Sequence, residues 1–330
     1  MMMIGNLREP RGILLVGATL AALVAAIGFA YQRQQAVVDA VAFVDVTGSM
    51  NARDGAGPDA GRTRIDAAQA AIRDLAQRLP CGSRLGLGIF SERRAFLLFG
   101  PADVCQNYAA FDGALAELDW RMAWEGDSYV SKGLYDAIAI AGSLKSNVIF
   151  LTDGQEAPPL PASGVPDFEG KPGDVKGLVI GVGGNAKVPI PKFDDDGREI
   201  GVYVAGDVPN ANHHGLPGKG MESNAGWHPR NAPFGGEIVQ GDEHLTSMRS
   251  AHLKDLAART GLTFVGLSTE SSLSPMLLSH AALRTVTVTS SASIFPATLA
   301  LLLAAFLYAF TLVMRGARAF PKTFQNVQQQ

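Results

Sequence analysis

Two aspartates and three hydroxyl residues stand where they could together bind a metal ion. They are Asp45, Thr47, Ser49, Ser128 and Asp153. Carboxylate and neutral hydroxyl oxygens are hard ligands, which suit Mg²⁺, Mn²⁺ or Ca²⁺ better than zinc. The sequence therefore predicts a site for a divalent cation made of oxygen ligands.

The elements around these residues would place them at one edge of a sheet. Asp45 ends the apolar run 41–44, and Asp153 comes just after the apolar run 148–151. Such runs are typical of buried parallel strands, and ligands bind just beyond the carboxyl ends of those strands. Ser128 follows a glycine turn and precedes a predicted helix. The alternative is three unrelated strand ends with polar caps.

In order and spacing, these segments resemble the metal-ion-dependent adhesion site of von Willebrand factor A domains. The resemblance implies that Asp45 and Ser49 face the metal and that Thr47 fills the intermediate hydroxyl position. It also implies that Ser128 replaces the usual threonine and that Asp153 is an acid behind the direct ligands. One coordination position would stay open for an acidic residue of a partner protein. Asp127 departs from the pattern, and would either add a ligand or repel anionic partners.

The remaining pattern predicts an α/β fold with a doubly wound, mostly parallel sheet over residues 35–267. Strands and helices alternate, and a hairpin supplies an antiparallel edge. The predicted strands are 36–44, 85–90, 94–99, 147–151, 177–182 and 262–267, and the predicted helices are 64–79, 107–118, 130–144 and 244–260.

Residues 185–242 break this rhythm with many prolines and glycines, and we interpret them as an insertion. Two edge strands are expected around Asp194-Asp195-Asp196, which is either a hairpin turn or a calcium loop. His213, His214 and His228 would either bind a transition metal or belong to a polar loop without fixed geometry.

Two apolar runs, 12–31 and 294–314, are long enough to cross a bilayer. The first is either an uncleaved anchor or a signal peptide. Basic residues precede the first run and follow the second, so the ends 1–11 and 315–330 are predicted to be cytoplasmic. The domain between the runs would then lie in the periplasm of a bacterium, anchored in the inner membrane.

The two cysteines fit an oxidising compartment. Cys81 and Cys105 flank the predicted hairpin at nearly opposite positions, so a disulfide between them is geometrically reasonable. Two buried thiols are the alternative.

The composition and motifs argue against several functions. The net charge of −3 gives no sign of nucleic-acid binding. Neither a nucleophile constellation nor a phosphate-binding glycine loop is present, and residues 181–184 open no predicted helix. We therefore expect a binding protein and not an enzyme. A metal-dependent hydrolase that uses Asp45 and Asp153 as paired carboxylates is the alternative.

The layout of one domain between two spans resembles bacterial membrane-anchored A-domain proteins that work beside MoxR-type ATPases. Residues 44–54 and 152–159 are similar to those of MxaL-type accessory proteins of methanol oxidation. This similarity implies methanol dehydrogenase or its assembly proteins as the partner, and a role in placing Ca²⁺ in that enzyme. The alternative is a BatA/BatB-like protein of envelope stress or aerotolerance.

Overall fold

The computed structural model describes residues 10–28, 30–55, 61–123, 126–160, 163–194, 196–208, 242–267 and 272–318. It divides into two compact units. One unit is Ala36–Thr285, and the other joins Met1–Gln35 to Val286–Gln330. The helices and strands in chain order are α1 (Pro10–Ile27), β1 (Ala30–Asp45), η2 (Gly48–Asn51), α2 (Arg64–Arg78), β2 (Arg84–Ser91), β3 (Arg94–Asp103), α3 (Tyr108–Ala116), η4 (Trp120–Met122), α4 (Val130–Ser143), β4 (Asn147–Thr152), β5 (Gly177–Gly181), β6 (Val188–Pro189), β7 (Pro191–Phe193), β8 (Glu199–Val202), β9 (Leu245–Thr246), α5 (Ser250–Thr260), β10 (Thr263–Gly266), α6 (Leu273–His280), β11 (Leu283–Ser291) and α7 (Ile294–Arg318).

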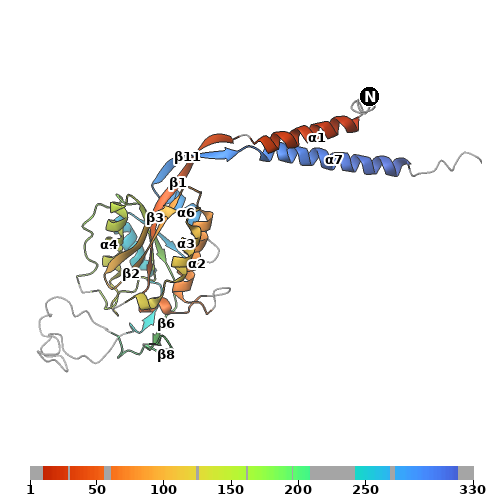
Figure 1. Cartoon of the computed structure of the whole chain (residues 1–330). Helices are drawn as coiled ribbons and strands as arrows, with labels where there is room; N and C mark the ends of the chain where they lie inside the picture. Colours follow the sequence, from red (N-terminus) through yellow and green to blue (C-terminus); the bar gives the residue numbers. More distant parts are fainter. Residues whose placement is uncertain are drawn as a thin grey trace, which may run out of the picture. The chain divides into compact units, whose positions relative to one another are not determined.

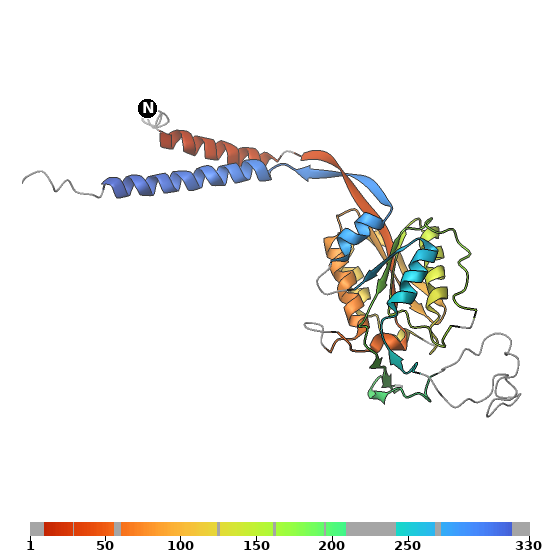
Figure 2. The same cartoon turned by 180° about the vertical axis from the view of Figure 1, so that it is seen from behind.

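The larger unit is built on a mostly parallel sheet in the order β10-β5-β4-β1-β2-β3. β1 pairs in parallel with both β2 and β4, whereas the edge strand β3 runs antiparallel to β2. A seventh strand, β11, also pairs with β1. Helices cover both faces of the sheet (Figures 1 and 2). This is the doubly wound α/β arrangement that the sequence predicts, with β1 at its centre.

Alternation along β1 divides the core into two layers. Ala40, Ala42 and Val44 face a cluster that includes side chains of α2, α3 and α6. Val41 and Phe43 point the other way, into a cluster with side chains of α4 and α5. Successive side chains of a strand point to opposite faces, so an apolar run is what a strand between two helix layers requires. Asp45 is the last residue of β1 and directly follows these apolar side chains.

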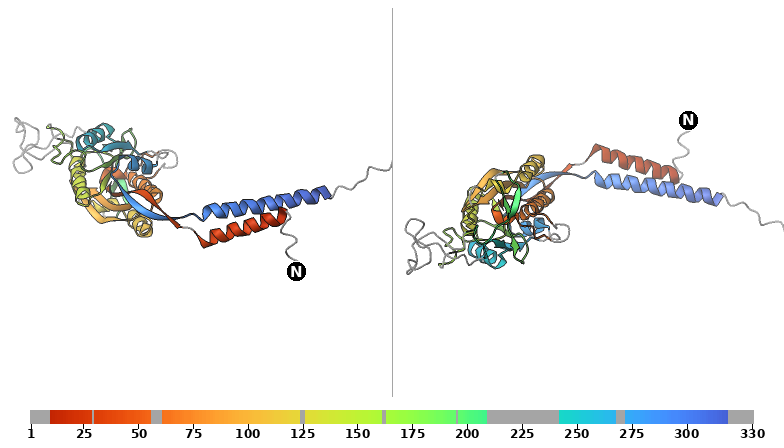
Figure 3. Two further views of the ribbon diagram at one scale, coloured as in Figure 1. Left: turned by 90° about the horizontal axis from the view of Figure 1, so that it is seen from above. Right: turned by 90° about the horizontal axis from the view of Figure 1, so that it is seen from below.

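The smaller unit contains two antiparallel helices that lie side by side (Figure 3). The Arg11 guanidinium lies 5.5 Å from the ring centre of Phe310, and a Cβ on Gly17 would lie 3.5 Å from Leu303. Within the described residues, α7 alone is long and apolar enough to span a membrane, over 294–312. α1 is apolar but shorter, because it ends at Ile27 before Gly28, whose φ is +71°.

Several predicted boundaries are wrong. β1 starts at Ala30 and not near residue 36, because its first half pairs with β11. β11 itself lies beyond the strand 262–267 that we expected to be the last. The helix predicted from 244 begins at Ser250, since residues 245–246 form β9.

The described part of the insertion forms two small separate sheets, not edge strands of the main sheet. β7 and β8 make a hairpin, in which the Asp194 carboxylate accepts hydrogen bonds from the backbone N–H groups of Asp196 and Arg198. This geometry is that of a turn, as the sequence indicates. Asp195, His213, His214 and His228 lie outside the described residues.

A disulfide joins Cys81 to Cys105, with the two Cα atoms 5.4 Å apart. It closes the chain around the β2–β3 hairpin, as the sequence predicts. The bridge lies between the loop before β2 and the loop after β3.

Candidate functional site

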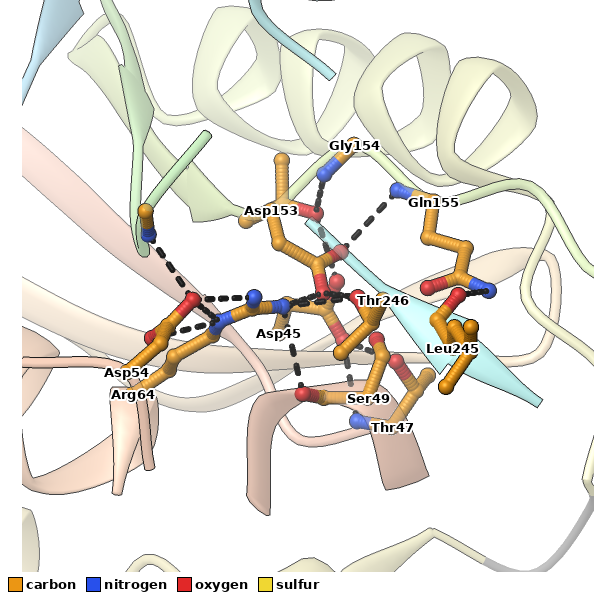
Figure 4. A network of polar contacts seen from close by, with 12 residues as sticks. Asp45, Thr47, Ser49, Asp54, Arg64, Asp153, Gly154, Gln155, Leu245 and Thr246 are labelled. Atoms are coloured by element: carbon orange, nitrogen blue, oxygen red, sulfur yellow. Dashed lines mark hydrogen bonds and ion pairs between the residues drawn. The ribbon is translucent and has the colours of Figure 1, made fainter. Parts of the chain in front are cut away.

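The candidate site lies at the carboxyl ends of β1 and β4. In the register of the sheet Asp45 lies beside Phe90 of β2, and Val44 lies beside Leu151 of β4. The aspartates that end these two strand segments therefore come close together, as Figure 4 shows. The short helix η2 follows Asp45 directly and carries Ser49, whose backbone carbonyl accepts from Ala52 N–H.

Asp45 is fully buried, and no cationic side chain of the described residues pairs with it. Its Oδ1 accepts hydrogen bonds from the Thr47 N–H at 2.9 Å and from the Thr47 hydroxyl at 2.6 Å. Its Oδ2 accepts from the Thr152 hydroxyl at 2.6 Å. Burial, and next the nearby charge of Asp153, raise the pKa of Asp45 to about 7, although these hydrogen bonds lower it. A cation bound beside a buried carboxylate offsets the cost of burying its charge, so such a position favours cation binding.

Ser128 is held by backbone pairing next to the end of β2. It bridges Glu92 on one side and Ala157 on the other. Its hydroxyl oxygen is buried and has no hydrogen-bond partner in the described part of the chain. Buried hydroxyls are normally hydrogen-bonded, so an orphaned oxygen needs an explanation such as a missing ligand.

Asp153 uses both carboxylate oxygens within the protein. Oδ1 accepts from the Gln155 N–H at 2.9 Å. Oδ2 accepts from Arg64 Nη1 at 2.5 Å and from the Thr246 hydroxyl at 3.0 Å. Asp153 therefore contributes negative charge to the site, but, unlike Asp45, it is already paired with a cationic side chain, that of Arg64.

Asp127 does not clearly join the five predicted residues. Burial, and next the charge of Asp127, raise the pKa of the neighbouring Tyr129 to about 12. The charge of the Asp127 carboxylate thus acts on this tyrosine.

Arg64, the first residue of α2, is the main site residue that sequence analysis missed. Its side chain is 1% exposed. It contacts Asp153, the Thr246 hydroxyl at 2.7 Å and, through Nη2 at 2.5 Å, Asp54. Burial lowers the pKa of Arg64, but its bonds to Asp54 and the charge of Asp153 outweigh this and raise it.

Asp54 completes this ion-pair network (Figure 4). Burial raises the pKa of Asp54, but the hydrogen bonds from Arg64 and from the Gly184 N–H outweigh it and lower the pKa. The backbone passes close to the guanidinium at Gly183, whose φ is +102° and whose Cβ would lie 2.3 Å from Arg64 Nε. Only glycine suits that position.

The donor set fits a divalent cation. Asp45, Asp54 and Asp153 carry three negative charges and Arg64 one positive charge, which leaves a buried charge of about −2 when all are ionised. The Ser49 hydroxyl and the orphaned Ser128 oxygen would add neutral oxygen ligands to such an ion. No cluster of three His, Cys, Asp or Glu suited to a metal occurs among the described residues, so any metal here must rely on hydroxyl ligands.

Residues 41–155 match the sequence model of the von Willebrand factor type A domain. Over these residues the chain is therefore similar to a von Willebrand factor type A (vWA) domain. This confirms the predicted α/β fold with a mostly parallel sheet. No curated protein matches the chain at a significant level.

Similar solved structures include bacterial membrane proteins. An aerotolerance-related membrane protein from Bacteroides fragilis is 14% identical, with a TM-score of 0.45, over 73% of this chain and 96% of that one. The protein BatB from Bacteroides thetaiotaomicron is 15% identical, with a TM-score of 0.45 and the same coverages. A von Willebrand factor type A protein from Catenulispora acidiphila is 15% identical, with a TM-score of 0.37, over 76% of this chain and 44% of that one.

Proposed function

We propose that this chain is a membrane-anchored vWA protein that binds a divalent cation and, through it, an acidic residue of a partner protein. Asp45 and Ser49 would hold the ion directly, with Thr47 and Ser128 as further hydroxyl ligands and Asp153 behind them. Mg²⁺, Mn²⁺ and Ca²⁺ all suit these oxygens. The observation that carries the proposal is the fully buried Asp45 carboxylate, which the described part of the chain leaves without a cationic partner.

The proposal also explains why a partner carboxylate would bind. A cation held mainly by neutral hydroxyls keeps part of its charge, so an Asp or Glu of another protein completes its shell. We propose binding and not catalysis as the role of the site. A hydrolase that uses Asp45 and Asp153 as its acid and base is the alternative, and phosphatase and protease assays on the purified chain test it.

For the placement in the cell, we propose that both α1 and α7 anchor the chain in the inner membrane of a bacterium. The antiparallel contact of the two helices supports a common membrane anchor for both. The vWA domain would then lie in the periplasm, where the disulfide is chemically stable. Labelling of single cysteines added near each terminus in intact cells tests this topology.

The sequence suggests two alternative roles for this protein, and they differ in the partner. One is assistance to methanol dehydrogenase or its assembly proteins, including Ca²⁺ placement. The other is a BatA/BatB-like role in envelope stress or aerotolerance, which fits the described vWA domain and apolar helices at least as well. A deletion strain separates them. Calcium-deficient, inactive dehydrogenase supports the first, and oxygen or envelope-stress sensitivity with a fully active dehydrogenase supports the second.

The metal hypothesis is tested on the full chain in detergent by titration calorimetry with Mg²⁺, Mn²⁺ and Ca²⁺. Asp45→Asn should abolish binding, whereas Asp255→Asn, which removes an exposed carboxylate of α5, should leave it unchanged. Affinity capture from membranes with and without these ions then identifies the partner. Equal cation binding by the wild type and Asp45→Asn would refute the assignment.

A further inference from the structure

Arg64 neutralises part of the charge around the proposed cation. It is the only cation bonded to the buried acids Asp54 and Asp153 among the described residues. A divalent ion added to a buried charge of about −2 gives a neutral cluster. Without Arg64 the same ion would leave a net negative charge, which opposes the approach of a partner carboxylate.

We propose that Arg64 is a positioning and specificity residue that sets the charge of the metal site for a divalent cation and an acidic partner. The inference rests on the proposed function and deepens it. Its guanidinium donates to Asp153 Oδ2, so that this oxygen would not be free to ligate an ion, and it binds Asp54, which also accepts from the Gly184 N–H. Arg64 thus fixes both the charge and the direction of the acids behind the direct ligands.

The contacts explain why an arginine suits this place better than a lysine. Arg64 Nη1 donates to Asp153 and to Thr246, while Nε and Nη2 donate to Asp54. These partners lie on different sides of one planar group, and a guanidinium can reach them together because it carries five donors in a fixed fork. An ammonium at the same place would supply the charge but could not span both carboxylates.

A charge role of Arg64 predicts opposite effects for two variants, whereas a structural role predicts the same effect for both. Asp54→Asn and Arg64→Met both break the same ion pair. The first makes the metal-free site less negative and should weaken Mg²⁺ or Mn²⁺ binding, on the order of tenfold. The second makes it more negative and should strengthen binding by a similar factor. A purely structural Arg64 would lead both variants to bind more weakly.

The double variant Asp54→Asn with Arg64→Met restores the original net charge. We expect its affinity for Mn²⁺ to lie within about threefold of the wild type. The ratio of the affinity for Tb³⁺ to that for Ca²⁺ should rise in Arg64→Met, because the site is more negative. It should return to the wild-type value in the double variant. Arg73→Met with Asp112→Asn, which removes a half-exposed ion pair that joins α2 to α3, is the matched control and should change nothing.

Arg64→Met leaves two buried carboxylates without a cation and could fail to fold. The comparison of Asp54→Asn with the double variant still decides the question. The proposal requires the double variant to bind Mn²⁺ about tenfold more tightly than Asp54→Asn, although it has lost more contacts. All measurements use the full chain in detergent at pH 8, with circular dichroism as the check of folding.

The outcomes are distinct. A wild type that binds no divalent cation refutes the proposed function and this inference with it. Binding by the wild type, with Asp54→Asn and the double variant equally weak, overturns the charge role of Arg64 and leaves the metal site in place. Opposite shifts in the two single variants, with recovery in the double variant, support the proposal.

Discussion

The substitution Asp45→Asn should stabilise the metal-free protein at alkaline pH. The pKa of Asp45 rises from 3.8 to about 7 on folding, chiefly because burial disfavours its charge. The folded state therefore binds a proton more tightly than the unfolded state. At about 1.4 kcal/mol per pH unit, this difference amounts to about 4 kcal/mol. The contribution is fully present below pH 3.8 and is lost as the pH rises through about 7.

Asparagine keeps the shape and the hydrogen bonds of this position. Its carbonyl oxygen can accept from Thr47, and its amide can donate to the hydroxyl of Thr152, which replaces the bond that Thr152 now donates. The variant therefore lacks the buried charge without losing contacts. At pH 8 and in the presence of EDTA, we expect it to be more stable than the wild type by up to about 4 kcal/mol, or roughly 10 °C in Tm.

The measurement is the thermal unfolding of the full chain in detergent between pH 5 and 8. The wild-type Tm should fall relative to that of Asp45→Asn as the pH rises, and the gap should narrow when Mg²⁺ or Mn²⁺ is added. An ion at about 100 times its Kd should return about 2.7 kcal/mol to the wild type and nothing to the variant. Parallel curves for the two proteins across this pH range would show that the reasoning about Asp45 is wrong.

Three further predictions test the scaffold around the site by thermal or urea unfolding. Replacing both Cys81 and Cys105 by serine should cost about 3 kcal/mol, because the bridge closes a loop with a sequence separation of 24 residues. Gly133→Ala should cost more than an ordinary surface change, since its Cβ would lie 2.1 Å from Phe90, and an unchanged Tm would contradict this packing. Thr63→Ala removes the capping box of α2 and should cost about 1 kcal/mol, whereas an unchanged stability would show that the cap does not matter.

The position of the acids could be predicted from sequence because parallel strands bring their carboxyl ends together. Asp45 and Asp153 follow apolar runs, and the structure joins their segments through the bond from Thr152 to Asp45. Such runs are a strong signal when both faces of a sheet are covered by helices. The arrangement of hydroxyls around a metal remains a prediction, since it depends on the ion.

The role of Arg64 could not be predicted in the same way. Arginine at the start of an amphipathic helix is normally exposed. Its burial here depends on Asp54 and Asp153, which lie 10 and 89 residues away in the chain. Only the tertiary fold brings these three charges together, and no local pattern contains that information.

The strand β11 was missed although its signal is present. Residues 285–289 alternate threonine and valine, and the exposure of β11 alternates with a period of two. The strands predicted from the sequence ended at residue 267 and did not include this segment. The polar first residues of β1 were not predicted as a strand, because their partner strand β11 was not predicted either. In the structure the Gln34 side chain donates to the Thr287 hydroxyl of β11.

Residues 243–249, which follow the insertion, hold Asp153 and its neighbours in place although they are distant from them in sequence. Thr246 donates to Asp153, the Arg249 N–H donates to the Asp153 carbonyl, and Gln155 donates to the Glu243 carbonyl. Arg64 donates to Thr246 as well as to Asp153, so these residues share one hydrogen-bond network. Because both oxygens of Asp153 are used, its carboxylate cannot move toward a cation without changing the bonds to Arg64 and Thr246. Binding of the proposed cation would therefore be linked to the conformation of residues 243–249 through these hydrogen bonds.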